Sequence, residues 1–369
     1  ARQHSLRSWI HSENLFFLAA AFFHEIITRP KITTVVFSNF PHEGSFIILY
    51  HLAKLMGLEI VITSQSNFSR KMWIVKSIED LGVFETISGE CQTLPTPDAP
   101  ETPFYMKRAG KYRLALNMGA RVLSEHLKML VKILTLKVMW DPQSVDRNMN
   151  RLAHARDRFR VGEPSPRDVV DVDLDVPFVY FPMHLQPEMT TDTWGYEYGD
   201  QLLAIEALAT ALPEDMLIYA KENPVQTRFM REESFYRRMR AIPNLRYVSY
   251  EVPSFDLIRK SAFVATIAGT AGWEAALLGK GVIHFGVAWY SSLPGVFKWM
   301  GQETGAHTVE KALTYQGDRA ALVASFTNIS KKMYTGVVDP AFADIIPNFD
   351  EVAEARAAAA SIARVLRET

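Results

Sequence analysis

The chain has 369 residues, of which 48% are hydrophobic and 22% are charged. These proportions are those of a water-soluble globular protein, and the length predicts about two domains. The formal net charge of −1 excludes a typical nucleic-acid-binding protein, which carries a large basic excess. The single cysteine, Cys91, excludes an intramolecular disulfide and a multi-cysteine metal site, and it fits a reducing compartment.

The first predicted element is a helix that contains the apolar run LFFLAAAFF at residues 15–23. A membrane span needs about 20 apolar residues, and this run is followed at once by His24 and Glu25. We therefore expect a buried helix. No signal peptide is recognised ahead of it, although the chain begins at Ala1 without Met, and we expect a cytoplasmic protein.

Strands and helices are then predicted to alternate. β-branched, apolar stretches typical of strands alternate with stretches of helical spacing, each of which ends at a glycine. The predicted order is strand 31–40, helix 45–57, strand 58–66 and helix 70–82. Such alternation indicates a parallel sheet with crossover helices.

A basic segment follows a proline-rich loop at residues 91–103. Between residues 104 and 140 Glu125 is the only acidic residue, and the basic ones are Lys107, Arg108, Lys111, Arg113, Arg121, Lys128, Lys132 and Lys137. The pattern is helical from about residue 112. This segment is expected to hold an anionic glycan or to lie on an anionic membrane leaflet, and a solvated basic helix is the alternative.

A second α/β region begins after a proline-rich, acidic linker at residues 160–177. Three strands are predicted at 176–183, 216–224 and 244–250, with helices at 200–213 and 254–262, the latter capped by Ser254. Residues 263–286 then read as strand, glycine turn, helix and strand. The terminal stretch 350–369 is a strong helix former that we expect to pack back across the protein.

The glycine turn carries the first candidate binding residues, Gly269, Thr270 and Gly272. Glycines allow a ligand to approach the backbone, and the first amides of a helix are unpaired donors at a positive dipole end. The turn is therefore a candidate phosphate site, and Glu274 is placed to accept hydrogen bonds from ribose hydroxyls. A tight turn that packs the helix on the strand is the alternative.

Two further strands of this region end in polar residues. Lys221 and Asn223 follow the strand at 216–224, where Lys221 would neutralise a phosphate and Asn223 would donate to one. His184, Gln186, Glu188 and Asp192 follow the strand at 176–183. Because ligands bind beyond the carboxyl ends of strands in open α/β sheets, we expect these groups to lie near the glycine turn. A solvated loop is the alternative.

The segments VYFPMHLQPEMTTDTWG and IAGTAGWEAALLGKGVIHFG resemble the bacterial capsule polysaccharide biosynthesis family, whose better-understood members look like Kdo transferases. The resemblance is specific over residues 179–290 and faint over the first 170. The family usually ends the lysine strand with His-Pro, and its histidine is thought to contact the nucleotide phosphate. This chain has Asn223-Pro224 there, and an asparagine can donate a hydrogen bond but cannot become cationic.

The resemblance implies an α/β fold of GT-B type, with two Rossmann-like domains facing a cleft and a C-terminal helix crossing back. The implied domains are an acceptor-side domain at 1–170, a nucleotide-sugar domain at 176–345 and the terminal helix at 346–369. His184, Gln186, Lys221, Asn223, Gly269, Thr270, Gly272 and Glu274 would bind the donor. No metal or other cofactor is expected, because such enzymes usually meet the phosphate charge with helix ends and side chains.

The implied reaction moves a sugar, best Kdo or a related acidic sugar from a CMP-activated donor, onto a surface glycan or glycolipid of the capsule or lipopolysaccharide. An oxocarbenium-like transition state needs a nearby carboxylate, for which Glu188 is the first candidate and Asp192 the second. His42 and Glu43 are candidates for the base that deprotonates the acceptor. The alternatives are a non-hydrolysing nucleotide-sugar epimerase and a non-catalytic glycan-binding or export protein.

Overall fold

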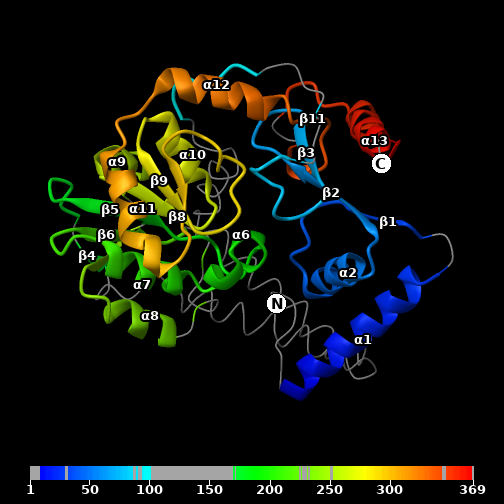
Figure 1. The fold of residues 1–369 in the computed structure, drawn as a ribbon, viewed down its shortest axis with the longest axis horizontal. Coiled ribbons are helices and arrows are strands. Elements are labelled where there is room, and N and C mark those ends of the chain that lie inside the picture. Colours follow the sequence, from blue (N-terminus) through cyan, green and yellow to red (C-terminus); the bar gives the residue numbers. More distant parts are fainter. Residues whose placement is uncertain are drawn as a thin grey trace, which may run out of the picture.

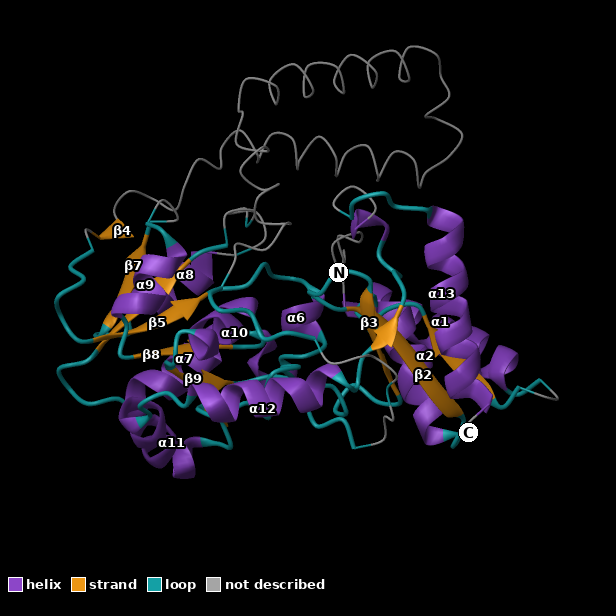
Figure 2. Cartoon of the chain, turned by 90° about the horizontal axis from the view of Figure 1, so that it is seen from above, coloured by secondary structure: helices purple, strands orange, loops and turns teal. Residues whose placement is uncertain are grey.

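The computed structural model describes residues 9–29, 32–85, 89, 94–100, 169–170, 172–223, 226, 231, 233–249, 252–342 and 346–367. The strands form two sheets, and α6 (Met189–Asp192) lies between them in both views, while α12 (Arg319–Ser330) runs along the top of the second sheet in Figure 1 (Figures 1 and 2). The basic segment at 104–140 and Cys91 lie outside the described residues.

The first sheet has the order β1-β2-β3-β11. Its strands are β1 (Thr34–Phe37), β2 (Glu59–Gln65), β3 (Lys71–Val75) and β11 (Tyr334–Thr335). β1 and β2 are parallel and are joined by α2 (Gly44–Leu55), as predicted. β3 runs antiparallel to β2, so the helix predicted at 70–82 is wrong. Met72 to Val75 are all buried, as in a strand that is covered on both faces.

The first helix, α1 (Trp9–Ile27), forms as predicted but does not have the predicted burial. It packs mainly against α2 and leaves much of its apolar surface in solvent. Phe17 is 60% exposed and Leu18 is 68% exposed. The expectation of a buried helix is therefore wrong, because one neighbouring helix covers only one face. No helix in the described ranges is both long enough and apolar enough to cross a membrane.

The C-terminal part of the chain returns to this first sheet. β11 pairs with β3, and α13 (Glu351–Arg367) packs on it beside the N-terminal elements (Figure 1). Ser361 Oγ donates to the Thr335 carbonyl at 2.8 Å, and Arg70 Nε lies 2.5 Å from Glu354 Oε1. A short 3-10 helix, η3 (Pro340–Phe342), precedes α13. The predicted return of the terminal helix is therefore confirmed.

The second sheet is parallel throughout and has the order β10-β9-β8-β5-β6-β7-β4. Its strands are β4 (Val169–Val170), β5 (Phe178–Pro182), β6 (Leu217–Lys221), β7 (Leu245–Val248), β8 (Phe263–Thr266), β9 (Gly281–His284) and β10 (Val296–Lys298). Without the short edge strand β4, which lies in the predicted linker, this is the strand order of a doubly wound nucleotide-binding sheet. The predicted α/β class is confirmed.

The sheet order reverses between β5 and β8, which are adjacent but are separated in the chain by β6 and β7. Loops that leave two such strands diverge to opposite faces of the sheet. In open α/β sheets this switch point is where ligands bind, beyond the carboxyl ends of the strands. The residues that follow β5 and β8 are therefore the first place to look for a site.

Helices follow the strands of the second sheet. They are η1 (Tyr196–Gly199), α7 (Gln201–Ala211), α8 (Glu233–Arg240), α9 (Ser254–Lys260), α10 (Thr270–Leu277) and α11 (Gln302–Thr314). Asp200 caps α7 by accepting a hydrogen bond from the Leu202 amide. The N-cap of α9 is Pro253, so the prediction that Ser254 caps this helix is wrong. The hydroxyl of Ser254 has another partner, described below.

Both faces of the second sheet are buried, because successive side chains of β5 enter different parts of the core. Val179 and Phe181 face one cluster, while Phe178 and Tyr180 face a second cluster that also contains side chains of the first sheet. Figure 2 shows the two sheets from above with α10 and α12 toward the middle. This second cluster is therefore a hydrophobic core shared by the two sheets.

Candidate binding site at the switch point of the second sheet

The turn between β8 and α10 contains two glycines that make room for side chains of the protein itself. A Cβ on Gly269 would lie 2.3 Å from Cε1 of His184, and a Cβ on Gly272 would lie 2.3 Å from Oη of Tyr290. Tyr290 Oη also donates to the Gly269 carbonyl at 2.5 Å. Neither glycine has a positive φ, so close packing is the reason for their presence.

His184 joins the ends of β5 and β8. Its Nε2 lies 3.0 Å from Oγ1 of Thr266, and Gly269 N–H donates to the same oxygen at 3.2 Å. Burial, and then the positive charge of Arg231, lower the pKa of His184 to about 4. The imidazole is therefore neutral at pH 7. The predicted meeting of the 184–188 loop with the glycine turn is present at this contact.

Gln186 uses both ends of its side-chain amide within the protein. Its Nε2 donates to the Gly199 carbonyl at 2.6 Å, and its Oε1 accepts from Gln201 at 3.1 Å and from Arg231 at 2.8 Å. Its backbone exchanges two hydrogen bonds with the Gln226 side chain. Gln186 therefore shapes the loop, and its contact with the nucleotide-sugar donor stays a prediction.

Arg231 and Glu222 form a buried ion pair behind the loop. Their side chains are 1% and 8% exposed, and Nε of Arg231 lies 2.8 Å from Oε2 of Glu222. A second hydrogen bond of 3.0 Å makes the pair bidentate. Phe235 covers the guanidinium, with its ring centroid 4.3 Å from Cζ.

Lys221 and Asn223 end β6, one strand away from the switch point. The ammonium group of Lys221 is buried and donates to the Val252 carbonyl at 2.5 Å and to Ser254 Oγ at 2.9 Å. Asn223 is partly buried, and its N–H donates to Glu222 Oε1 at 3.0 Å. Lys221 therefore ties the end of β6 to the start of α9.

Glu274 is buried one turn into α10 and hydrogen-bonds to Thr270. Burial raises its pKa to about 7, and the Thr270 contact opposes this rise. Burial, together with the negative charge of Glu274, raises the pKa of Tyr180, whose hydroxyl lies 3.4 Å from Ser254 Oγ. Ser254 thereby hydrogen-bonds both to Tyr180 on β5 and to Lys221 at the end of β6.

Glu188 and Asp192 bound the short helix α6. Glu188 is the partly buried N-cap residue, and its N–H donates to Thr191 Oγ1 at 3.2 Å. Asp192 is exposed and accepts a hydrogen bond from Thr191 Oγ1 at 3.1 Å. The two carboxylates therefore belong to one segment that starts four residues after His184.

His42 and Glu43 lie in the loop between β1 and α2. Nδ1 of His42 is 2.8 Å from the Phe40 carbonyl, and Glu43 is the exposed N-cap residue of α2. The same loop touches the end of α6, because Thr193 Oγ1 donates to the Pro41 carbonyl at 2.7 Å. The structure therefore brings the loop of the two candidate bases next to the segment of the two candidate carboxylates.

Several residues that shape the site were missed by the sequence reasoning. Arg231, Gln201 and Gln226 hold the loop after β5, while Thr266, Ser254 and Tyr290 hold the groups around it. The alternation of strands and helices identifies loops, but it carries no signal for a buried arginine between elements. Among the described residues, no group of three or more His, Cys, Asp or Glu side chains is arranged to hold a metal ion.

The family model for capsule polysaccharide biosynthesis proteins matches residues 196–334. This match confirms the resemblance that was noted from the sequence. No curated protein sequence matches the chain.

Solved structures provide three comparisons at low identity. KpsC of Thermosulfurimonas dismutans, a beta Kdo 2,7 transferase, is 10% identical over 91% of this chain and 85% of that chain, with a TM-score of 0.36. HepE of Anabaena in complex with UDP-glucose is 14% identical over 42% of this chain, with a TM-score of 0.30. The match spans 43% of the HepE chain. UDP-GlcNAc 2-epimerase of Methanocaldococcus jannaschii is 11% identical over 86% of this chain and 81% of that chain, with a TM-score of 0.32.

Proposed function

We propose that the chain is a glycosyltransferase of bacterial surface-glycan synthesis that binds a nucleotide sugar at the switch point between β5 and β8. The observation that carries the proposal is the contact of His184 with Gly269, which joins the loops after these two strands. This is where a doubly wound sheet binds a nucleotide. The match of residues 196–334 to the capsule biosynthesis family supports the same reaction class.

In this proposal the phosphate of the donor lies at the N-terminus of α10. The first amides of that helix and the Thr270 hydroxyl would donate to it, and Lys221 would add positive charge close to the strand ends. Glu274 would accept from the ribose. The donor is best a CMP-activated Kdo or related acidic sugar, and no metal is needed for the charge. The acceptor would be a capsule or lipopolysaccharide glycan, with the basic segment at 104–140 as its docking region or as a contact with the inner face of the cytoplasmic membrane.

Glu188 is the proposed carboxylate beside the anomeric carbon, as nucleophile or ion-pair stabiliser, and Asp192 is the reserve. Transfer needs negative charge there when the leaving phosphate departs and the sugar becomes oxocarbenium-like. His42 or Glu43 would accept the proton of the acceptor hydroxyl. The loop that holds both lies against the end of α6 through Thr193 and Pro41.

Glu188→Gln tests the assignment. We expect the variant to bind the nucleotide as the unsubstituted protein does and to lose transfer by about 100-fold or more, because only the charge of the carboxylate is removed. The measurements are isothermal titration with CMP, UDP and GDP, and sugar transfer to a capsule oligosaccharide. Glu197→Gln, an exposed carboxylate on η1, is the matched control and should transfer normally.

Unchanged transfer by Glu188→Gln would remove this residue from the mechanism and move the role to Asp192, tested with Asp192→Asn. Binding of none of the three nucleotides would contradict the enzyme and favour a non-catalytic glycan-binding protein. Conversion of the donor into an epimeric nucleotide sugar with no acceptor present would contradict transfer and favour the non-hydrolysing epimerase.

A further inference from the structure

Among the groups that hold the loop after β5, Arg231 contributes a buried guanidinium. Arg231 directs Nε and Nη2 to the two oxygens of Glu222, Nη2 also to the His184 carbonyl at 3.0 Å, and Nη1 to Gln186 Oε1 at 2.8 Å. One guanidinium thus contacts the Glu222 carboxylate, the His184 backbone and the Gln186 side chain. An arginine reaches all of them because its donors form a rigid planar fork, and a lysine has no such geometry.

The hydrogen bonds around the His184 ring assign its tautomer. Thr266 Oγ1 already accepts from Gly269 N–H, and it lies 3.0 Å from His184 Nε2. No other acceptor for the Thr266 hydroxyl hydrogen is found among the described residues, so this hydroxyl can donate to Nε2. Ala268 N–H also points at Nε2, at 3.5 Å. Two donors face this nitrogen, so Nε2 accepts and the proton of the neutral ring is on Nδ1.

Nδ1 of His184 is the open end of this arrangement. Within the described part of the chain no hydrogen bond to this nitrogen is formed, and His184 is only partly buried. A ligand oxygen is therefore free to accept from it. The ring is packed against Gly269, beside the first turn of α10.

We propose that Arg231 is a positioning residue of the donor site, which fixes the end of β5 so that His184 offers Nδ1–H as an uncharged donor to a phosphate oxygen of the nucleotide. The proposal rests on the proposed function for the identity of the ligand. An uncharged donor adds a hydrogen bond to the leaving phosphate without giving up a proton at neutral pH. Glu222 serves by neutralising the guanidinium and setting its plane.

Arg231→Lys tests the proposal, because it keeps the charge and removes the fork. We expect the dissociation constant of the nucleotide that the protein binds best among CMP, UDP and GDP to rise by about tenfold, equivalent to the loss of one hydrogen bond to a charged group. The ¹⁵N spectrum of the histidine rings should show His184 as a neutral Nδ1–H imidazole in the unsubstituted protein and as a shifted or averaged signal in Arg231→Lys. His184→Gln identifies the signal.

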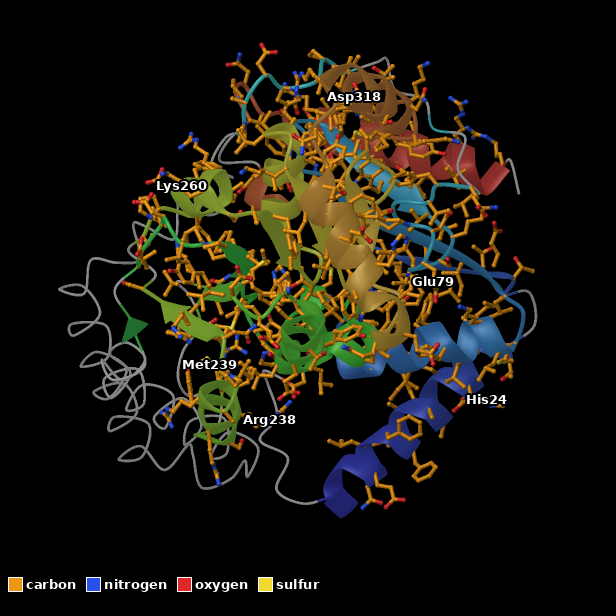
Figure 3. The ribbon with its side chains drawn as sticks, turned by 60° about the vertical axis from the view of Figure 1, so that its left-hand side comes forward. His24, Glu79, Arg238, Met239, Lys260 and Asp318 are labelled. Carbon is orange, nitrogen blue, oxygen red and sulfur yellow. The ribbon has the colours of Figure 1, made fainter. Side chains whose placement is uncertain are left out.

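Arg238→Lys is the matched control. Arg238 lies on α8 and pairs with the carboxylates of Asp200 and Glu206, but its side chain is 41% exposed at the surface (Figure 3). This control should leave both the dissociation constant and the His184 signal unchanged.

A second variant covers the case in which Arg231→Lys fails to fold. Arg231→Met combined with Glu222→Met leaves no unpaired buried charge, and Gln201 still donates to the His184 carbonyl and to Gln186 Oε1. We expect a folded protein by circular dichroism with the same altered His184 signal and weakened nucleotide binding.

The outcomes separate the two proposals. The role of Arg231 would be overturned if both variants bound the nucleotide and gave the His184 signal as the unsubstituted protein does. That result would leave the proposed function intact. Failure of the unsubstituted protein to bind any of the three nucleotides would end the proposed function. In that case the positioning role of Arg231 is tested by the His184 signal alone. An unchanged signal in the Arg231 variants would overturn this role, and a changed signal would support it.

Discussion

Glu274 has a pKa raised to about 7 by burial, from an ordinary value of 4.5. Between these two values the unfolded chain has lost the proton and the folded chain keeps it, so the folded state binds more protons. The free energy of unfolding therefore falls as the pH rises through this window. The direction is opposite to that of a carboxylate in a salt bridge.

Glu274→Gln is expected to abolish this loss of folding stability with rising pH. Relative to the unsubstituted protein, the variant should gain up to about 3 kcal/mol of stability between pH 5 and pH 8. Urea unfolding at several pH values measures the difference. His184 and His284, whose pKa values are each lowered to about 4 by burial, stabilise the fold less as the pH falls from 6.5, but both proteins share this effect. A constant difference over the whole range would contradict the shifted pKa.

Gly269→Ala probes the contact between the two loops. Its Cβ would meet His184 Cε1 at 2.3 Å, and the ring cannot move aside without leaving Thr266. We expect a stability loss of about 1 to 3 kcal/mol together with weaker nucleotide binding, measured by thermal shift and titration. Gly44→Ala is the control, because nothing lies within 4 Å of its added carbon. Equal behaviour of the two variants would argue against close packing at residue 269.

For single residues, the sequence predicts where a side chain lies in the fold better than it predicts what that side chain contacts. The pattern of strand ends correctly placed His184 and Gly269 close together, because strand order and loop position follow from hydrophobic periodicity. The contacts of Gly269 with His184 and of Gly272 with Tyr290 were not predicted, and the approach of a ligand to this turn stays a prediction. The partners of Gln186 and Lys221 depend on residues far away in the chain, and periodicity contains no information about such contacts.

Single elements show where the pattern misleads. In residues 70–82 the apolar side chains Ile74, Ile78 and Leu81 recur at helical spacing, which predicted a helix. Residues 71–75 instead form β3, since four consecutive buried side chains suit a strand with neighbours on both faces. The strand gains its antiparallel partner β11 from the far end of the chain, and no local window of sequence contains that partner.

Lys221 gives a prediction about how two elements are joined. It connects the end of β6 to the start of α9 through Val252 and Ser254 while it is almost fully buried. Lys221→Met should lower the free energy of unfolding by about 1 to 3 kcal/mol even without nucleotide, because the two oxygens lose their donor. Urea unfolding measures this.

Lys260→Met is the control for this element. Lys260 is at the end of α9 and is paired at 3.4 Å with Asp175, and both side chains are largely exposed (Figure 3). Such pairs contribute about 0 to 1 kcal/mol, so the substitution should change little. If Lys221→Met is as harmless as Lys260→Met, then the hydrogen bonds of Lys221 do not hold β6 to α9.

The two halves of the molecule are joined by aromatic side chains. Phe68 lies in the loop before β3. Its ring centroid is 5.6 Å from that of Trp289 and 5.2 Å from that of Phe326. Trp289 also lies 5.0 Å from Trp273, on α10. These contacts extend the core from the first sheet to the helix that begins at the candidate site.

Phe68→Ala should therefore weaken the whole molecule and the connection between its halves. We expect a loss of about 2 to 4 kcal/mol and a broadened or divided thermal transition by calorimetry, because the two sheets lose a shared contact. Phe22→Ala, at a position that is 56% exposed on α1, should stay within about 0.5 kcal/mol of the unsubstituted protein. A sharp single transition with an unchanged midpoint in Phe68→Ala would contradict this coupling.

For the molecule as a whole, the sequence predicted the parallel second sheet and the return of the terminal helix. The reason is that strands with continuous apolar runs, such as Phe178 to Phe181, can only be buried on both faces, and helices between them must cover those faces. It did not predict the antiparallel half of the first sheet. Nor did it predict the exposure of α1, since burial depends on what else is available to cover a helix.

The pairing of β11 with β3 has a consequence for synthesis on the ribosome. β3 emerges early, but its neighbour at Tyr334–Thr335 and the covering helix α13 emerge only after every strand of the second sheet has been translated. The nascent N-terminal strands must therefore wait with an unpaired edge while the later half is already able to collapse. Chaperone demand during translation should accordingly concentrate on the first hundred residues.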